Sequence, residues 1–253
     1  MNKDRVNFFG AKIDPLTMPE TLDVVAEIIE QRKMTQHVVV NAAKLVMMQK
    51  DKELRDIVNS CGLINADGQG IVWGARLLGV GVPERVAGID LFTNIVHMAS
   101  ERNYKLYFLG ATQNVVTKVV ELFQSKYPKL QVAGFHDGYF KGSEETKIVE
   151  DIRHSQADVL FVAMGSPKKE IFISKYMRDM SVPFVMGVGG SFDVVAGVTK
   201  RAPLWMQRVG LEWFYRFLCE PKRMWRRYLV TNTVYLGMIL KALVTGKKEV
   251  VSL

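Results

Sequence analysis

The sequence predicts an α/β fold, in which a Rossmann-like, mainly parallel sheet is flanked by helices and followed by a C-terminal helical, membrane-binding appendage. Three observations predict it. Short runs of β-branched and aromatic residues alternate with longer runs of helical periodicity. The helical runs are about 10–15 residues long, as in the crossovers that join parallel strands. The chain has 253 residues, of which 48% are hydrophobic, enough for one large core with or without an appendage.

Six apolar runs predict strands, at residues 37–41, 62–66, 105–109, 130–134, 158–164 and 183–187. The runs between them predict helices, at residues 42–59, 69–78, 89–102, 113–127 and 144–155, with a further helix beginning at Pro167. Ligands of such sheets bind beyond the carboxyl ends of the strands. The candidate binding loops are therefore Asn41, residues 67–68, 110–111, 136–139, 165–167 and 187–190.

The composition changes after Ala202, which predicts a core at residues 1–202 and a helical appendage at 203–253. The net charge is +8, and between residues 200 and 229 eight Lys or Arg face only two acids. This basic cluster indicates a polyanionic partner, which is a nucleic acid, an anionic lipid or a phosphorylated ligand, and a solvated charged surface is the alternative. Pro221 divides two expected helices, whose aromatic and arginine side chains interleave. That pattern is typical of a membrane-surface element, and an ordinary helix pair packed on the core is the alternative.

Several classes of protein are disfavoured. Cys61 and Cys219 lie far apart with no CxxC spacing, so neither a disulfide framework nor a zinc site is expected. The four histidines have no metal-binding spacing, and no DxD pair is present, so we expect no metal and no cofactor. The N-terminus lacks the pattern of a signal peptide, and no run of about 18 apolar residues occurs. We expect a cytoplasmic protein.

Asp67, at the end of a predicted strand, could act as a general base or bind a sugar hydroxyl. The alternative is an N-cap for the helix that begins at Gln69. The segment from Gly165 to Glu170 combines a glycine turn and a helix N-terminus with the charges of Lys168 and Lys169, which favours anionic oxygens. The alternative there is a plain turn with solvated lysines.

Residues 187–193 contain a GxGG pattern whose backbone could approach a diphosphate or a uracil closely. The alternative is a tight turn that needs glycine only for its backbone angles. Phe192 stands where a dinucleotide-binding GxGxxG fingerprint needs its last glycine, which argues against a nicotinamide-dependent oxidoreductase.

Taken together and in this order, segments spread over nearly the whole chain resemble the WecG/TagA/CpsF family of bacterial glycosyltransferases. They are Asn41, residues 67–68, 83–88 (PERVAG), 134–140 (GFHDGYF), 162–167 (VAMGSP), 187–193 (GVGGSFD), 200–203 (KRAP), 211–216 (LEWFYR) and 220–223 (EPKR). The chain looks nearer the enterobacterial-antigen branch than the teichoic-acid branch.

The resemblance implies inverting, metal-independent transfer from a UDP-sugar to an acceptor on undecaprenyl diphosphate. The sugar would be N-acetylmannosamine, its uronic acid or a glucose-type sugar, and the product a cell-surface polysaccharide precursor. The resemblance also implies that the appendage docks on an anionic membrane surface and completes the active site. The enzyme would then lie on the inner face of the cytoplasmic membrane.

Carried over by motif, Asp67 matches the family's proposed base, and Arg85 a residue near the acceptor or the leaving phosphate. The arginines that would meet the leaving diphosphate are Arg216, Arg223 and Arg226. Tyr139 and Asp193 match donor-pocket positions. The other candidate substrate-binding residues are Asn41, Gly110, Asp137, Gly165, Lys169, Gly189 and Gly190.

This chain departs from the family pattern at two positions. Val39 stands where the teichoic-acid branch has a threonine, so a hydroxyl contact is lost. Lys169 stands where glutamine is common, and a cation there could favour an acidic sugar or an extra phosphate contact.

A basic nucleic-acid-binding α/β protein is the alternative reading, because basic charge and interleaved aromatics suit both partners. The apolar segment 235–240 (YLGMIL) favours a bilayer interface over a phosphate backbone, so we expect no nucleic-acid partner. A homo-oligomer stays open, since an apolar appendage can also pack against another subunit.

Overall fold

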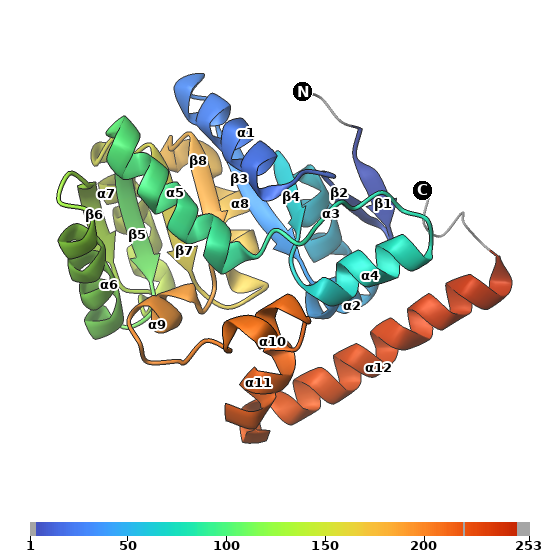
Figure 1. The fold of residues 1–253 in the computed structure, drawn as a ribbon. Coiled ribbons are helices and arrows are strands. Elements are labelled where there is room, and N and C mark those ends of the chain that lie inside the picture. The colour runs from blue at the N-terminus through green and yellow to red at the C-terminus, as the bar shows by residue number, and fades with distance from the viewer. Residues whose placement is uncertain (1–3, 220, 247–253) are drawn as a thin grey trace.

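The computed structural model describes residues 4–219 and 221–246. Its centre is a six-stranded parallel sheet with helices on both faces, which confirms the predicted α/β class (Figure 1). The strands lie in the order β4-β3-β8-β7-β5-β6. Their bounds are β3 Thr35–Val40, β4 Leu63–Ala66, β5 Lys105–Gly110, β6 Gln131–His136, β7 Val159–Ala163 and β8 Phe184–Gly187. All six overlap the runs that the sequence predicts.

One face of the sheet is covered by helices whose apolar residues share a single buried cluster, namely α1 (Met18–Glu30), α5 (Gly88–Arg102), α6 (Gln113–Lys126) and α9 (Ser191–Val195). At its centre Phe92 contacts Phe108, Phe161 and Phe192, with ring centroids 4.6 to 6.5 Å apart. Because α9 contributes Phe192 to this centre, the loop between β8 and α9 is anchored to the core.

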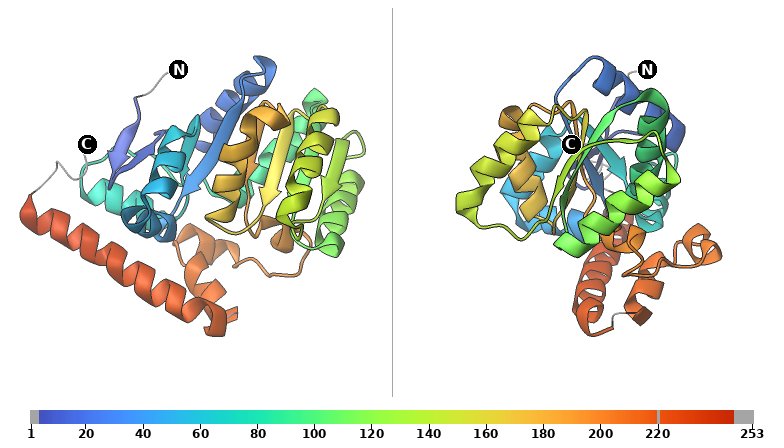
Figure 2. Two further views of the ribbon diagram at one scale, coloured as in Figure 1. Left: turned by 180° about the vertical axis from the view of Figure 1, so that it is seen from behind. Right: turned by 90° about the vertical axis from the view of Figure 1, so that its left-hand side faces the viewer.

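The opposite face carries two clusters. Helices α7 (Glu145–His154) and α8 (Lys168–Met180) cover the half of the sheet near β5 and β7. The half near β3 and β4 is covered by α2 (Ala42–Lys50), α3 (Lys52–Ser60) and α4 (Gln69–Leu77). These layers leave the carboxyl ends of the strands facing one edge, toward α9, α10 and α11 (Figures 1 and 2).

The expected single helix at residues 42–59 is wrong, because two helices meet at Asp51. The backbone of Asp51 is extended, at φ −116° and ψ 101°, which ends α2. Its side chain then accepts a hydrogen bond of 2.9 Å from the N–H of Leu54 and so begins α3.

The N-terminal segment, which the strand and helix patterns leave unassigned, forms a hairpin and a helix. The hairpin pairs β1 (Val6–Phe8) with β2 (Ala11–Ile13) in antiparallel register. Helix α1 begins with a capping box, in which Thr17 and Glu20 bind each other's backbone N–H groups. The hairpin adds Phe8 and Ile13 to the core beside β4.

The C-terminal segment forms α10 (Leu204–Arg208), α11 (Glu212–Cys219) and α12 (Pro221–Thr245). Pro221 begins α12, as the sequence predicts. Tyr235, Ile239 and Ala242 are buried in the same cluster as α2 and α4, so α12 lies along these core helices (Figure 1). The apolar segment 235–240 is thus shared between core and solvent, because Leu236 and Leu240 are exposed. Within the described ranges, no helix is both long and apolar enough to cross a membrane.

Candidate active site

The parallel sheet brings the six candidate loops to one edge, and close backbone contacts join neighbouring loops. A Cβ on Gly68 would lie 3.9 Å from the Cβ of Asn41, so the loops after β4 and β3 touch. A Cβ on Gly110, whose φ is +127°, would overlap the carbonyl of Ala163, so the loops after β5 and β7 touch as well. The edge is a continuous row of loops, in which glycine permits the closest approaches.

Asp67 lies at the end of β4, at one side of this row. Its N–H donates a hydrogen bond of 2.8 Å to the carbonyl oxygen of Val40, which fixes the Asp67 backbone to the end of β3. Helix α4 begins at Gln69 and its N-cap residue is Gly68, with φ +109°. Asp67 therefore precedes the cap position, and the alternative reading of Asp67 as a helix cap is wrong.

Asn41 has a structural role in addition to its candidate one. It is the N-cap of α2, and its Oδ1 accepts a hydrogen bond of 3.0 Å from the N–H of Lys44. This contact holds the Asn41 side chain beside the loop of Asp67.

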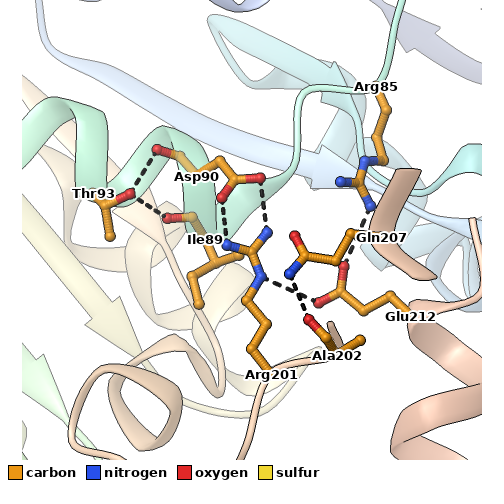
Figure 3. A network of polar contacts seen from close by, with 8 residues as sticks. All are labelled: Arg85, Ile89, Asp90, Thr93, Arg201, Ala202, Gln207 and Glu212. Carbon is orange, nitrogen blue, oxygen red and sulfur yellow. Dashed lines mark hydrogen bonds and ion pairs between the residues drawn. The ribbon is translucent and has the colours of Figure 1, made fainter. Parts of the chain in front are cut away.

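A network of arginines and carboxylates lies beyond the end of β4 (Figure 3). Asp90, in the first turn of α5, binds Arg201 through two parallel hydrogen bonds of 2.6 and 2.8 Å. Glu212, in the first turn of α11, accepts a hydrogen bond of 3.3 Å from Arg85 and lies 3.7 Å from Nε of Arg201. The two guanidinium groups are thereby gathered from a loop of the core and from the segment before α10.

Asp67 is within electrostatic reach of this network. Burial acts to lower the pKa of Arg201, but Asp90, followed by Glu212 and Asp67, raises that pKa above its ordinary value. Arg201 is thus a positive group whose charge acts on the candidate base. Sequence reasoning did not select Arg201, Asp90 or Glu212, although the motifs 200–203 and 211–216 carried the signal.

A second cluster lies where the loops after β3 and β7 meet. The Glu170 carboxylate is 2.7 Å from Nζ of Lys44 and 2.9 Å from Nζ of Lys169, and it accepts a hydrogen bond of 2.8 Å from Ser166. All three charged residues are buried, so the alternative of a solvated lysine is wrong for Lys169. Burial acts to raise the pKa of Glu170, but Lys44 and Lys169 hold that pKa at about 2.

The glycine loop after β8 is shaped by Lys169 and by its own turn. A Cβ on Gly187 would lie 2.9 Å from Cδ of Lys169, so glycine there makes room for the lysine stem. Gly189 has φ +55°, a value that favours glycine. Gly190 is the N-cap of α9, and Asp193 lies in the first turn of that helix. The GxGG pattern therefore has both a turn function and a packing function.

The third group of candidates lies beyond β5 and β6. The N–H of Gly138 binds the carbonyl of Ala111 at 2.9 Å, which joins these two loops. Oδ1 of Asp137 accepts a hydrogen bond of 2.7 Å from the N–H of Tyr139, and the Tyr139 side chain is 79% exposed. Since β4 and β6 are the two edge strands and strands lie about 4.8 Å apart, Tyr139 and Asp67 are separated by roughly 24 Å along the edge.

Three of the arginines predicted to meet the leaving diphosphate belong to the C-terminal segment, and the structure does not describe their side chains. Arg216 lies in α11, and Arg223 and Arg226 lie in α12, but their side chains are outside the described residues. Their contact with a leaving diphosphate stays a prediction. Over residues 4–219 and 221–246, no group of three or more His, Cys, Asp or Glu is placed to hold a metal ion.

Comparison with known proteins decides the family. The model of the glycosyl transferase WecG/TagA/CpsF family matches residues 6–249 of the chain. The chain belongs to this family. It is therefore a glycosyltransferase, and the resemblance read from its motifs is confirmed.

Curated relatives cover most of the chain. It is 38% identical over 180 residues to an N-acetylglucosaminyldiphosphoundecaprenol N-acetyl-beta-D-mannosaminyltransferase of Bacillus subtilis (strain 168), covering 71% of this chain and 69% of the relative. It is 30% identical over 243 residues to a protein of the same name from Staphylococcus aureus (strain NCTC 8325 / PS 47), covering 95% and 94% of the two chains. Neither the family nor these relatives support the nucleic-acid-binding alternative.

Proposed function

We propose that this glycosyltransferase moves N-acetylmannosamine from its UDP-sugar to N-acetylglucosamine on undecaprenyl diphosphate, with inversion at the anomeric carbon and without a metal ion. The names of the relatives support this acceptor and this sugar, and the beta linkage in those names agrees with inversion of an α-linked donor. The uronic acid and glucose-type donors are the competing outcomes of a donor screen.

The single observation that carries the mechanism is the position of Asp67 at the end of β4, within electrostatic reach of Arg201. In the proposed reaction the Asp67 carboxylate removes the proton of the acceptor hydroxyl. The hydroxyl oxygen attacks the anomeric carbon, and the bond from that carbon to the β-phosphate oxygen breaks. UDP leaves with the electron pair of that bond.

Arginine side chains would bind both diphosphates of the reaction. Arg85 and Arg201 are partly buried and held at the sheet edge by carboxylates, where they would bind the diphosphate of the lipid acceptor, because fixed guanidinium groups in such a place need little reorganisation. Arg216, Arg223 and Arg226 would stabilise, from the appendage, the charge that builds on the departing diphosphate of UDP. This arginine set is the support for proposing a metal-independent reaction.

The donor would lie along the row of loops from β4 toward β6. Lys169, Gly189, Gly190 and Asp193 would surround the sugar and the phosphates, while Asp137 and the exposed ring of Tyr139 would meet the far part of the nucleotide. The loop glycines Gly110 and Gly165 would let the backbone approach the donor closely.

The lipid-linked acceptor would be reached at the inner face of the cytoplasmic membrane, with the appendage against anionic lipid. The exposed apolar residues of the C-terminal segment support this placement, and they include Leu204, Trp205, Val209, Leu218, Leu236 and Leu240. Binding of the enzyme to vesicles with and without anionic lipid would test this placement. Binding should need the anionic lipid and should fall as salt is added, because salt screens the attraction between charges.

The first experiment is a donor screen. The purified enzyme is incubated with a panel of UDP-sugars and a short-chain lipid diphosphate that bears N-acetylglucosamine, with and without EDTA, and products are read by mass spectrometry. One added N-acetylhexosamine, formed from UDP-N-acetylmannosamine in EDTA as well, is the expected result. A protein that binds no UDP would contradict the proposal, and product from a different donor would correct its sugar.

A further inference from the structure

The Glu212 carboxylate lies between two guanidinium groups, with one oxygen toward each (Figure 3). Its Oε2 is 3.3 Å from Nη1 of Arg85, and its Oε1 is 3.7 Å from Nε of Arg201. The side chains of Arg85 and Glu212 are only 16% and 17% exposed. A charged contact so shielded from water is stronger than a surface ion pair, so Glu212 constrains where the two arginines point.

The two carboxylates of the network hold the arginines unequally. Asp90 binds Arg201 at 2.6 and 2.8 Å in the parallel geometry that fixes the plane of a guanidinium group. Nε of Arg201 is buried without a hydrogen bond, because Glu212 stands beyond hydrogen-bond distance. Asp90 therefore fixes Arg201 to the core, while Glu212 makes the longer contacts.

Glu212 belongs to a different part of the chain from the residues it meets. Arg85 and Asp90 belong to the loop before α5 and to α5 itself, and Arg201 precedes α10, whereas Glu212 begins α11. Only ten residues of the chain separate Arg201 from Glu212. Within this segment the side chain of Gln207 donates a hydrogen bond of 2.6 Å to the carbonyl oxygen of Ala202. The position of α11 therefore determines whether the carboxylate reaches Arg85.

Arg85 keeps the capacity to bind phosphate while it is held. A guanidinium group has five N–H donors, and within the described residues the contact with Glu212 uses one of them. The remaining donors can meet phosphate oxygens while the contact with Glu212 fixes the orientation of the group.

We propose that Glu212 is a positioning residue of the transfer reaction, which orients Arg85, with Arg201 beside it, toward the diphosphate of the lipid acceptor only when α11 is docked on the sheet edge. This proposal rests on the proposed function, since it assigns a role within that reaction. It gives the start of α11 a function distinct from that of the appendage arginines.

The test compares Glu212→Gln and Glu212→Asp with the wild-type full-length enzyme. Glu145→Gln is the matched control, because it removes an ion pair with Lys175 of 3.1 Å between α7 and α8. We expect Glu212→Gln to lower kcat/KM for the short-chain lipid acceptor about 10- to 100-fold, while the Kd for UDP changes less than about twofold. Glu212→Asp should recover part of the loss, and Glu145→Gln should behave as wild type.

Two further measurements separate positioning from a general structural role. In the double variant Arg85→Lys/Glu212→Gln, the loss should not exceed that of Arg85→Lys alone by more than about twofold, because Glu212 acts through Arg85. Hydrogen exchange of the amides at 204–219 should be faster in Glu212→Gln than in wild type or in Glu145→Gln.

Activity of Glu212→Gln within about twofold of wild type, losses that multiply in the double variant, or unchanged exchange at 204–219 would each overturn the proposal. Absence of product with the wild-type enzyme would instead contradict the proposed function. Hydrogen exchange at 204–219 would still test whether Glu212 holds α11 in place, because it does not depend on product formation.

Discussion

The hydroxyl group of Tyr235 donates a hydrogen bond of 2.7 Å to the carbonyl oxygen of Gly70, and this bond fastens the C-terminal helix α12 to the core helix α4. One turn further along α4, Gly74 faces Tyr235 and Ile239 so closely that a Cβ would overlap the tyrosine hydroxyl. The pairing of a small residue on α4 with large ones on α12 is what lets the two helices approach.

Gly74→Ala should weaken this packing. The added methyl group would meet Tyr235 and lie 2.8 Å from Cδ1 of Ile239, so we expect a loss of about 1–3 kcal/mol in the free energy of unfolding, measured in urea. Gly70→Ala is the control within the same helix, because its Cβ would meet Tyr235 at an ordinary 3.9 Å. That variant should be unchanged or gain up to about 1 kcal/mol, and equal losses in both would contradict the packing argument.

Glu170→Gln should destabilise the fold strongly, because it leaves the ammonium of Lys44 buried without its carboxylate partner. We expect a loss of about 3–5 kcal/mol at pH 7. Glu145→Gln, which breaks a more exposed pair, should cost about 1 kcal/mol or less. Urea titrations of the three proteins give both values, and a loss for Glu170→Gln no larger than that of the control would argue against a tight buried cluster.

The Glu170 carboxylate should also make the stability of the fold depend on pH in the acidic range. The folded pKa of Glu170, about 2, lies below its ordinary value of 4.5 because Lys44 and Lys169 outweigh the effect of burial. Its contribution is therefore complete above about pH 4.5 and is lost as the pH falls toward 2. The difference in stability between wild type and Glu170→Gln should narrow over that window, and a constant difference would be inconsistent with a lowered pKa.

His37 should make the free energy of unfolding depend on pH between about 4 and 6.5, a higher range than that of Glu170. Burial, together with the charge of Lys44 and against the hydrogen bond that Nε2 of His37 donates to Oδ1 of Asn65, lowers the pKa of His37 from 6.5 to about 4. Between those values the unfolded chain binds a proton that the folded chain does not, so stability falls as the pH drops. From pH 7 to pH 4.5 wild type should lose about 2–3 kcal/mol more than His37→Gln. Parallel pH profiles for the two proteins would exclude this assignment.

Asp67→Asn tests the proposed base directly. We expect kcat to fall about 10²- to 10⁴-fold, because the amide cannot accept the proton of the acceptor hydroxyl. The Kd for UDP, measured by calorimetry, should stay within roughly a factor of two. Asp56→Asn, at an exposed position of α3, is the control. Unchanged turnover in Asp67→Asn would remove Asp67 from the mechanism.

The positions of the strands, and of the loops that follow them, could be predicted from the sequence because both are local properties. Alternating apolar runs mark β3 to β8, and a parallel sheet brings their following loops to one edge. The break at Asp51 is absent from the prediction because neither glycine nor proline marks it. The capping signal of Asp51 was present, and so was that of Thr17 and Glu20 before α1.

The buried cluster of Lys44, Lys169 and Glu170 could not be predicted in this way. Charged residues are almost always exposed, and Lys44 and Glu170 are 126 positions apart, so no local pattern pairs them. The arginine network could not be predicted for the same reason, because Arg85 and Glu212 are 127 positions apart in the sequence. The motifs were visible in the chain, but their partners depend on the sheet order.

The contact between Gly187 and Lys169 makes the choice of residue at 187 depend on the residue at 169. The lysine stem occupies the space that a side chain at 187 would need, because a Cβ there would lie 2.9 Å from Cδ of Lys169. Glycine at 187 accepts a lysine or a shorter side chain at 169, whereas a larger residue at 187 would force the lysine to move. An engineer who wants a larger residue at 187 should therefore shorten residue 169 at the same time.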